Sequence, residues 1–400
     1  MREGWREATL GKVLEVIDRR CGTNGPTQVL SITEKRGIVP QEAVFRKRIA
    51  TSDLSRYKML EPLDIAYNPY LLWAGAIGQW LGSEAGVTSP VYECFRVRSS
   101  AQPRFLGLLL ESGILTPYFD STAIGSIQRR RRTTTSVFLG APLLLPPLDE
   151  QRRIVDLITT VDEAIQGSES EAIAARMLLG ALRTELIDHS DAPRLKLSDV
   201  LETVDGGRSP VTEGRPPGPG ERGVLKLSAV RTGQFDFAES KAVSPAVSLP
   251  ASALVSLGDV LITRSNTPET VGAVCFVDEV RPQTYLSDLT LRLTPRPDCL
   301  PAYLAAALTT PEARRQITSS AKGTSGSMRK ISRQTIAELT IPLPDRDHQQ
   351  SVVSLLDAAA ATVKRGHASR AALLRLRSSL LSDLLSGDHE IPAGYDEVMG

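Results

Sequence analysis

The sequence has few residues of the kinds that build catalytic or metal sites. Only four cysteines and four histidines occur among 400 residues. The cysteines form no Cys-x-x-Cys pair, which argues against a disulfide framework or a zinc site and is typical of reduced thiols in a cytoplasmic protein. The histidines all lie in or beside two long helical stretches, so the globular parts offer none as a general base or metal ligand. These residues are Cys21, Cys94, Cys275 and Cys299, and His189, His348, His367 and His389.

Long apolar runs and net charge are also missing. No run of 18 apolar residues is present, and residues 1–7 lack the apolar core of a signal peptide, so the sequence predicts no membrane span and a cytoplasmic location. The net charge is only +1. Any binding to nucleic acid must therefore depend on local basic surface. With 41% hydrophobic and 23% charged residues, the chain is expected to fold into two or three domains with buried cores.

The sequence does contain a long internal repeat. Leu10–Asp18 returns as Leu197–Asp205, 187 positions later, and Leu145–Val155 returns as Leu343–Val353, 198 positions later. Two copies of roughly 190 residues are too long for a solenoid, so each copy is expected to be a globular unit followed by a helix. A chain of this kind offers two related but unequal surfaces.

Each globular part is predicted to be a mixed α/β unit. Short segments rich in β-branched and aliphatic residues, bounded by turn residues, indicate strands, and one helix follows them in each copy. A Pro/Gly-rich stretch at residues 208–222 is expected to be a surface loop found only in the second copy. The predicted strands are Gln28–Ile32, Leu63–Tyr67 and Tyr92–Val97, then Val224–Leu227, Val260–Thr263 and Leu289–Thr294; the helices are Phe105–Glu111 and Ala302–Thr309.

Two long amphipathic helices follow the globular parts. Apolar residues recur at spacings of three and four after Asp149 and again after Asp347, which predicts helices with a heptad-like seam and an aspartate at each N-cap. About 40 residues would give a helix of roughly 60 Å. Each helix is expected to bury its apolar face against the other, as an antiparallel pair.

Here the sequence resembles a known family. The pattern Pro-x-x-(Glu/Asp)-Gln-x-x-Ile/Val that opens each long helix, the Leu-rich ending at Leu384–Gly387 and the duplicated layout resemble the specificity (S) subunits of Type I restriction–modification systems. The resemblance covers essentially the whole chain and is strongest at Pro146–Ile158, Pro344–Leu356 and Leu373–Gly387. One departure is Asp347-His348-Gln349, where the family has a Glu-Gln pair.

The resemblance implies an α+β fold in which two pseudo-symmetric α/β target-recognition domains are separated by a pair of long antiparallel, coiled-coil-like helices. The expected divisions are residues 1–148 for the first domain, 149–190 for the central helix, 191–346 for the second domain, 347–388 for the distal helix and 389–400 for a tail. The implied function is non-catalytic recognition of an asymmetric, bipartite double-stranded DNA target, as part of defence against foreign DNA.

The resemblance also implies partners. These are methyltransferase (modification) subunits and a restriction and translocase subunit, which would carry S-adenosylmethionine, ATP and magnesium, while this chain binds no cofactor or metal and contacts no membrane. Docking is expected at the conserved starts of the two long helices. The residues are Pro146, Glu150, Gln151 and Ile154, and Pro344, Gln349 and Val352.

A basic loop recurs at the same place in both copies. Arg129, Arg130, Arg131, Arg132 and Thr133 align at an offset of 198 with a segment that contains Arg329 and Lys330, and Lys322 precedes that segment. Arginine and lysine neutralise phosphates, and hydroxyls and backbone amides add short hydrogen bonds. The recurrence favours DNA contact over an ordinary solvated charge run.

Two further loops are candidates for contact with bases. Arg264 and Asn266 have the geometry for guanine and adenine edges, although many loop residues do. In the first copy, Asn68-Pro69-Tyr70 lies in an unusual cluster of aromatic residues. This tripeptide also resembles the Asn-Pro-Pro-Tyr loop of amino-methyltransferases, but it lacks the second proline and has no counterpart in the second copy. A turn after a strand, or a loop that contacts bases, explains it better.

Two other functions remain as alternatives. Asp205 with Glu239 and Lys241 resembles the acidic-pair-plus-lysine core of many nucleases, although Glu-x-Lys occurs by chance in most chains of this size. The second is a pure scaffold whose helices assemble other proteins without reading bases, which equal affinity for all DNA sequences would favour. Activity of the purified chain alone would favour an enzyme.

The repeat leads to three predictions. The two globular units are related by an approximate two-fold axis across the helix pair. The two units read different sequences, because the copies share little outside the repeated blocks. Replacement of Arg130, Arg131 and Arg132 with alanine weakens binding to all DNA alike, and the salt dependence falls by up to ~0.9 per lost phosphate contact.

Overall fold

The computed structural model describes residues 4–45, 49–125, 131–323, 328–387, 389 and 391. Contacts within the chain divide it into two units, which are residues 1–168 with 368–400 (unit 1) and residues 169–367 (unit 2). The first copy of the repeat lies in unit 1 and the second in unit 2. Each long helix contributes one part to each unit.

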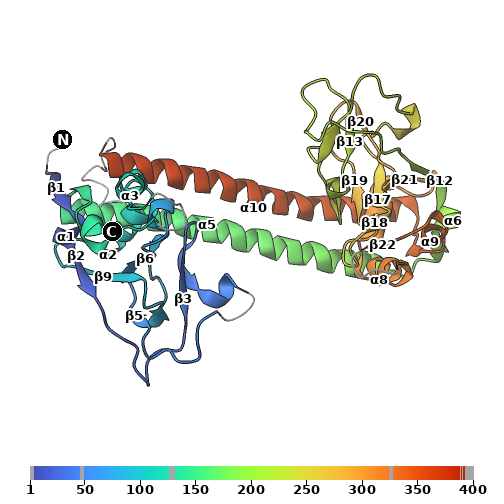
Figure 1. The fold of residues 1–400 in the computed structure, drawn as a ribbon. Coiled ribbons are helices and arrows are strands. Elements are labelled where there is room, and N and C mark those ends of the chain that lie inside the picture. Colours follow the sequence, from blue (N-terminus) through green and yellow to red (C-terminus); the bar gives the residue numbers. More distant parts are fainter. Residues whose placement is uncertain are drawn as a thin grey trace. The chain divides into compact units, whose positions relative to one another are not determined.

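Unit 1 is built around a four-stranded antiparallel sheet of order β2-β9-β6-β7 (Figure 1). Three two-stranded pairs accompany it, β1 with β10, β3 with β4 and β5 with β8. The elements are β1 Arg6–Thr9, α1 Leu10–Val13, β2 Leu14–Ile17, β3 Leu30–Thr33, β4 Gly37–Pro40, β5 Lys58–Leu60, β6 Ile65–Tyr67, β7 Ile77–Gln79, β8 Gly86–Thr88, β9 Glu93–Val97, α2 Pro103–Glu111, α3 Thr116–Thr122, α4 Thr135–Leu139 and β10 Pro142–Leu145.

Unit 2 has a four-stranded antiparallel sheet of order β12-β21-β17-β19, together with a three-stranded sheet β16-β13-β20 and three two-stranded pairs. The elements are β11 Arg194–Lys196, α6 Leu197–Val200, β12 Leu201–Gly206, β13 Gly223–Leu225, β14 Val230–Arg231, β15 Gln234–Phe235, β16 Ser240–Ala242, β17 Val260–Thr263, β18 Ser265–Asn266, β19 Val274–Phe276, β20 Thr284–Tyr285, β21 Thr290–Pro295, α7 Pro301–Leu308, α8 Pro311–Ser320, β22 Arg329–Lys330, α9 Arg333–Ala337 and β23 Thr340–Pro342.

The main sheets of the two units have the same topology. In chain order, β2, β6, β7 and β9 correspond to β12, β17, β19 and β21, and the neighbours in each sheet are the same. One ion pair is repeated as well, because Arg96 binds Asp64 at 3.0 Å in unit 1 and Arg292 binds Asp259 at 2.7 Å in unit 2. The internal repeat of the sequence is therefore a repeat of structure.

The strands and short helices predicted from composition are confirmed, with shifted ends. Strand β17 spans Val260–Thr263 as predicted, and all four of its residues are buried. Helix α2 begins earlier than predicted, at Pro103, because the side chain of Gln102 caps it by accepting a hydrogen bond from the Phe105 amide at 2.6 Å. Proline fits this first position because it has no amide hydrogen to leave unpaired.

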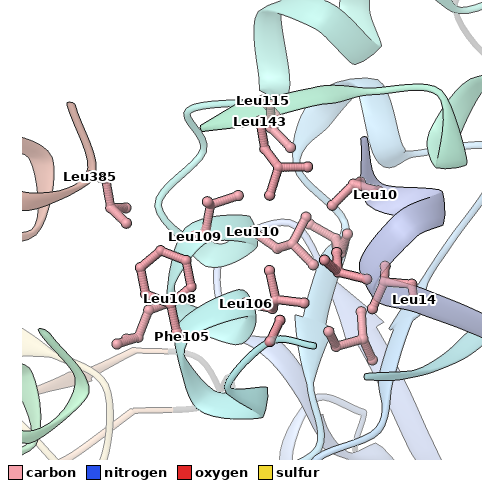
Figure 2. Close-up of a cluster of buried hydrophobic side chains, with 14 of the residues drawn as sticks. Leu10, Leu14, Phe105, Leu106, Leu108, Leu109, Leu110, Leu115, Leu143 and Leu385 are labelled. Atoms are coloured by element: carbon pink, nitrogen blue, oxygen red, sulfur yellow. The ribbon is translucent and has the colours of Figure 1, made fainter. Parts of the chain in front are cut away.

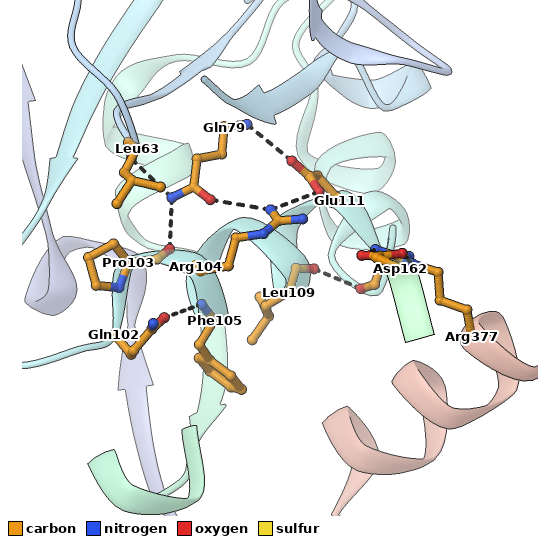
Figure 3. Close-up of polar contacts among 11 residues, drawn as sticks. Leu63, Gln79, Gln102, Pro103, Arg104, Phe105, Leu109, Glu111, Asp162 and Arg377 are labelled. Atoms are coloured by element: carbon orange, nitrogen blue, oxygen red, sulfur yellow. Dashed lines mark hydrogen bonds and ion pairs between the residues drawn. The ribbon is translucent and has the colours of Figure 1, made fainter. Parts of the chain in front are cut away.

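Hydrogen bonds of the Gln79 side chain connect strand β7 to the start of helix α2 (Figure 3). The Gln79 amide donates to the carbonyls of Leu63 at 3.0 Å and Pro103 at 2.8 Å, and its oxygen accepts from Arg104 at 3.3 Å. A Cβ at Gly107 would lie 2.2 Å from the Gln79 side-chain oxygen. Glycine at this position therefore leaves room for the Gln79 amide against α2.

The two long helices are α5, Leu148–Arg183, and α10, Arg346–Ser386. A short π-helical turn, Thr184–Asp188, follows α5. Asp149 and Asp347 lie inside the first turns of these helices and are not their N-caps. The cap of α10 is Asp345, whose carboxylate accepts from the His348 amide at 2.8 Å. The predicted caps are thus wrong, although a carboxylate in the first turn still stabilises the helix through its interaction with the helix dipole.

Within each unit, parts of α5 and α10 pack on one another. In unit 1, Arg377 donates to Asp162, and the hydroxyls of Ser168 and Ser369 lie 3.2 Å apart. The partner number falls as the residue number rises, so the helices are antiparallel there. In unit 2, Arg176 contacts His367 at 2.9 Å. In the part of the chain that the structure describes, no helix is long and apolar enough to span a membrane.

The core of unit 1 joins residues from both ends of the chain. Leu10, Phe105 and Ile154 belong to the same buried cluster as Leu381 and Leu385 of α10, and Figure 2 shows Leu385 next to the leucines of α2. The core of unit 2 is formed in the same way by Tyr303, Leu304, Val352 and Leu356. In both units the long helices are part of the domain core, because their apolar faces complete it.

Candidate nucleic-acid interface

In unit 1, the structure brings together two segments that the sequence predicted separately. The loop after β6 and the end of the basic loop are joined by a backbone hydrogen bond from the Thr133 amide to the Pro69 carbonyl, at 2.9 Å. Arg132 lies over the ring of Tyr70, with its guanidinium carbon 5.8 Å from the ring centroid. Arg131 lies over Trp73 at 4.9 Å.

The loop after β6 is fixed by its own hydrogen bonds. The side-chain oxygen of Asn68 accepts from the Tyr70 amide at 3.1 Å, which is an Asx turn, and the Trp73 indole donates to the Tyr70 carbonyl at 2.8 Å. The Asn68 amide donates to Ala76 at 3.0 Å. Asn68 thus acts as a turn residue, and Tyr70 is left on the surface with 42% of its side chain exposed.

The two described arginines of the basic loop have different surroundings. Arg131 donates to the Asp120 carboxylate at 2.6 Å and to the Asp120 carbonyl, and only 23% of its side chain is exposed. Arg132 is exposed, and its backbone pairs with Ile124 in both directions at 2.9 Å. Arg129 and Arg130 lie outside the described residues. Of the described pair, Arg132 is therefore the better placed for an external anion.

Thr133 is a correction to the predicted set. Its side chain is only 1% exposed, and its hydroxyl has no hydrogen-bond partner among the described residues. The matching position in unit 2 is Ile331, which is also buried. Thr133 therefore packs inside the unit and does not contact a phosphate.

Unit 2 repeats this arrangement with other side chains. The Ile331 amide donates to the Arg264 carbonyl at 2.9 Å, which matches the bond from Thr133 to Pro69. Strand β18 pairs with β22, so that Ser265 lies opposite Lys330 and Asn266 opposite Arg329. Lys322 pairs with Lys330, as Ile124 does with Arg132. The predicted candidates of unit 2 thus lie on segments that pair with one another.

The cations of these segments differ in exposure. Arg264, Lys322 and Lys330 are exposed, whereas Arg329 is half-buried and donates to the Ala321 carbonyl at 3.0 Å. The side-chain oxygen of Asn266 accepts from the Thr267 amide at 2.9 Å. Lys322 and Lys330, which are exposed and paired across neighbouring strands, are a suitable arrangement for binding an anionic backbone.

One further cation was missed by the sequence analysis. Arg333, at the start of α9, lines a cavity of about 320 Å³ together with Arg264 and Asp288. Its position could have been suspected from the N-cap serine, since the Ser332 side chain accepts from Thr335 at 3.0 Å and so starts a helix directly after the basic strand. No pattern in the sequence distinguished Arg333 itself as a candidate for DNA contact.

The predicted docking residues lie mostly inside their own units. Pro146, Glu150, Gln151, Ile154, Gln349 and Val352 are buried and Pro344 is half-buried. Such side chains cannot form an exposed docking surface, so the expected role is corrected: they attach each long helix to its own domain. Glu150 shows this, because it accepts a hydrogen bond from Trp5 at 3.0 Å.

The two repeated glutamines form the clearest of these attachments. The Gln151 side chain accepts from the Gln102 amide and donates to the Pro146 carbonyl, both at 2.8 Å. Gln349 repeats both bonds, with Leu300 and Pro344 at 2.8 Å, and adds one to Asp298 at 2.9 Å. Each glutamine therefore joins the start of a long helix to the start of a short helix of the same unit, α2 for Gln151 and α7 for Gln349.

The residues of the nuclease alternative have other partners. Asp205 accepts from the Thr203 hydroxyl at 2.6 Å. Glu239 binds Lys226 at 3.0 Å, and hydrogen bonds from Ser228 and Lys226 hold the pKa of Glu239 below its usual value. Within the described ranges, no cluster of three or more His, Cys, Asp or Glu residues could hold a metal ion.

Comparisons with known proteins agree with the resemblance read from the repeats. A curated relative, the Type I restriction enzyme EcoEI specificity subunit of Escherichia coli, is 28% identical over 165 residues, which are 40% of this chain. The aligned part spans 28% of the length of that relative. No protein-family model matches the chain.

Two solved structures share the fold. One, from work on complex assembly and conformational transition of the type I R-M system, matches with a TM-score of 0.59 and 20% identity over 97% of this chain and 99% of its own. The other, the S subunit of a Type I restriction–modification system from M. genitalium, matches with a TM-score of 0.55 and 10% identity over 97% of both chains. The chain thus has the mixed helix-and-strand fold of such S subunits.

Proposed function

We propose that this chain is the DNA-recognition subunit of a Type I restriction–modification system. One observation carries the proposal most directly: each unit brings a strand-end loop and a basic loop together through the same backbone hydrogen bond, from Thr133 to Pro69 and from Ile331 to Arg264. Both units have this arrangement of loops, with exposed cations in each. This fits a chain whose two units each bind DNA. The similarity to a curated specificity subunit supports the same function.

The ligand that suits these surfaces is double-stranded DNA. The chain as a whole carries a net charge of only +1, so attraction to DNA has to come from local groups such as Arg132 in unit 1 and Lys322 and Lys330 in unit 2. Cations held on short strands and turns position a protein on the phosphate backbone, while neighbouring side chains reach base edges. Each unit would contact one part of the site.

The target is proposed to be asymmetric. The two surfaces share a backbone arrangement but differ in side chains, since Tyr70 and Arg132 in unit 1 correspond to Ser265 and Lys330 in unit 2. Different side chains on a common frame read different base pairs. The two pseudo-symmetric units would then read two unlike half-sites.

In this proposal the chemistry belongs to partner subunits. Modification subunits would supply S-adenosylmethionine and methyl transfer, and a restriction subunit would supply ATP-driven translocation and magnesium-dependent cleavage. The proposed role of this chain is to bind DNA and to hold these subunits, and not to catalyse a reaction.

The partner contacts are proposed on an exposed apolar face of α5. In unit 2, Ile173, Met177 and Leu178 are 53%, 72% and 54% exposed, and the exposed Ala174 and Ala181 continue the same face. Residues at spacings of three and four share one side of a helix. A contiguous exposed apolar patch of this kind marks a protein contact. This face takes the docking role that the buried glutamines cannot have.

Selection of binding sites from a random DNA pool tests the proposal, with the full chain and its modification subunit present. The expected result is a split sequence with two unlike halves. Exchange of residues 1–148 for the corresponding domain of a relative should change only one half. Equal recovery of all sequences would favour a scaffold, and methylation or cleavage by the purified chain alone would favour an enzyme.

A further inference from the structure

Tyr70 and Arg132 form a pair that differs as a whole between the two units. The backbone bonds from Thr133 to Pro69 and from Ile331 to Arg264 place Tyr70 at the position of Ser265, and Arg132 at the position of Lys330. In unit 1 the pair is a ring with a guanidinium over it. In unit 2 it is a buried serine opposite an exposed lysine. Both residues of the pair therefore differ between unit 1 and unit 2.

Arg132 and Lys330 carry the same charge, and they differ in that the arginine head group is planar. A phosphate contact common to both units requires a positive charge, which both lysine and arginine supply. Arginine differs from lysine in its flat fork of N–H donors, and a fork lying over a ring keeps its plane while its edge stays free to donate.

The donors of Arg132 are available for such a contact. Its side chain is exposed and makes no hydrogen bond or ion pair with the residues that the structure describes. The adjacent Arg131 contrasts with it, because two of its nitrogens already donate to Asp120. Arg131 also packs over Trp73, whose indole is bonded to the Tyr70 carbonyl. Arg131 thus supports the loop that holds Tyr70.

We propose that Arg132 reads a guanine edge in the half-site contacted by unit 1, and that Tyr70 is the positioning residue that holds the plane of the guanidinium. Arginine can donate two parallel hydrogen bonds to O6 and N7 of guanine, which is the arrangement that a fixed guanidinium plane favours. Lys330 then serves as a phosphate contact in unit 2. This inference rests on the proposed function, since it assigns a ligand group within the same DNA surface.

The test uses the full chain with its modification subunit and the target selected by the wild-type protein. Affinity is measured for that target and for duplexes in which each base pair of the half-site is replaced in turn, at several salt concentrations. Arg132→Lys is the central variant because it keeps the charge and removes the fork. It should bind the correct site about 5- to 150-fold more weakly and lose preference at one G·C pair, with an unchanged salt slope.

Three further variants separate the roles. Tyr70→Phe keeps the ring and should behave as wild type, whereas Tyr70→Ala should weaken preference at the same base pair. Lys330→Ala should weaken binding to all sequences, with no change in preference at that base pair. Rescue by phenylalanine is a result that a role of the Tyr70 hydroxyl would not produce, and a loss confined to one base pair is a result that a merely structural role would not produce.

The outcomes distinguish this inference from the function beneath it. If Arg132→Lys keeps the full preference while the wild-type chain still selects a split site, Arg132 is a phosphate contact; the inference is then wrong and the proposed function stands. If the wild-type chain selects no sequence, both fall together.

Discussion

Arg377 of α10 donates to both carboxylate oxygens of Asp162 in α5, with Nη2 3.0 Å from Oδ2. This two-point contact fixes the register of the two helices within unit 1, because a planar guanidinium matches a carboxylate in only one orientation. The side chains are 24% and 34% exposed, so solvent screens part of the attraction.

Replacement of Arg377 with alanine should therefore lower the free energy of unfolding by about 0.5–1 kcal/mol, measured by urea denaturation. The loss should shrink in high salt. Arg375→Ala, at an exposed position on the same helix, is the matched control and should change little. A double-mutant cycle with Asp162→Asn isolates the pair, and a coupling energy of zero would contradict the assignment.

Gln349→Leu should destabilise the chain more strongly. The buried amide of Gln349 satisfies the Leu300 amide and the carbonyls of Asp298 and Pro344, and an apolar replacement leaves these groups unpaired inside the protein. The expected loss is about 2–4 kcal/mol in the free energy of unfolding. The exposed neighbour Gln350, replaced with alanine, is the control. If the two variants were equally stable, Gln349 would not be a structural attachment.

Lys322 and Lys330 should contribute charge without sequence preference. Their replacement with alanine should weaken binding to target and non-target DNA alike, and should reduce the slope of log affinity against log salt by up to ~0.9 for each lost contact. Lys241, exposed on β16, serves as the control. A change in preferred sequence with an unchanged salt slope would show instead that these lysines contact bases.

The apolar face of α5 can be tested with Ile173→Glu and Met177→Glu. Because both side chains are exposed, the fold should survive, as measured by circular dichroism and thermal unfolding. Co-purification with the modification subunit should be lost, since a carboxylate cannot be buried there without a partner. Ala164→Glu, at another exposed position on α5, should keep the complex intact. Retention of the partner by both face variants would place docking elsewhere.

The thiols give a prediction about pH. Burial raises the pKa of Cys94, Cys275 and Cys299 to about 12, whereas Cys21 is only half-buried. The thiolate is the reactive form, so the three buried groups should react slowly at pH 8 in the native chain. A thiol reagent should modify about one cysteine rapidly and all four after denaturation. Rapid modification of three or four in the native state would contradict this burial.

The sequence predicted elements well and the roles of individual polar residues poorly. Strands such as Val260–Thr263 and the two long helices follow from apolar patterning, because burial decides them. Gln151 belongs to a motif that the sequence repeats at Gln349, yet the sequence does not show whether the hydrogen-bond partners of a polar residue lie inside the protein. Its amide is satisfied by Gln102 and Pro146, which only the folded chain brings near.

The roles of the two arginines in the basic loop also depend on partners that only folding brings near. Arg131 and Arg132 are adjacent and chemically identical, so no pattern separates them. The difference arises from Asp120, which lies eleven positions away in sequence and neutralises only Arg131. The sequence identified both the Asn68 loop and the basic loop as candidates, but their contact depends on one backbone bond, from Thr133 to Pro69, between residues that are far apart in the chain.

The buried cluster of unit 1 contains Leu10 and Leu14 together with Leu381, Leu384 and Leu385. During synthesis, the domain that leaves the ribosome first therefore cannot complete its core until α10 has been made, whereas unit 2, a single continuous segment, can complete its core earlier. Contacts between residues so distant in sequence form slowly. An interruption of translation shortly before Leu381 would leave an exposed apolar surface at the opposite end of the chain, on a domain whose own sequence is intact.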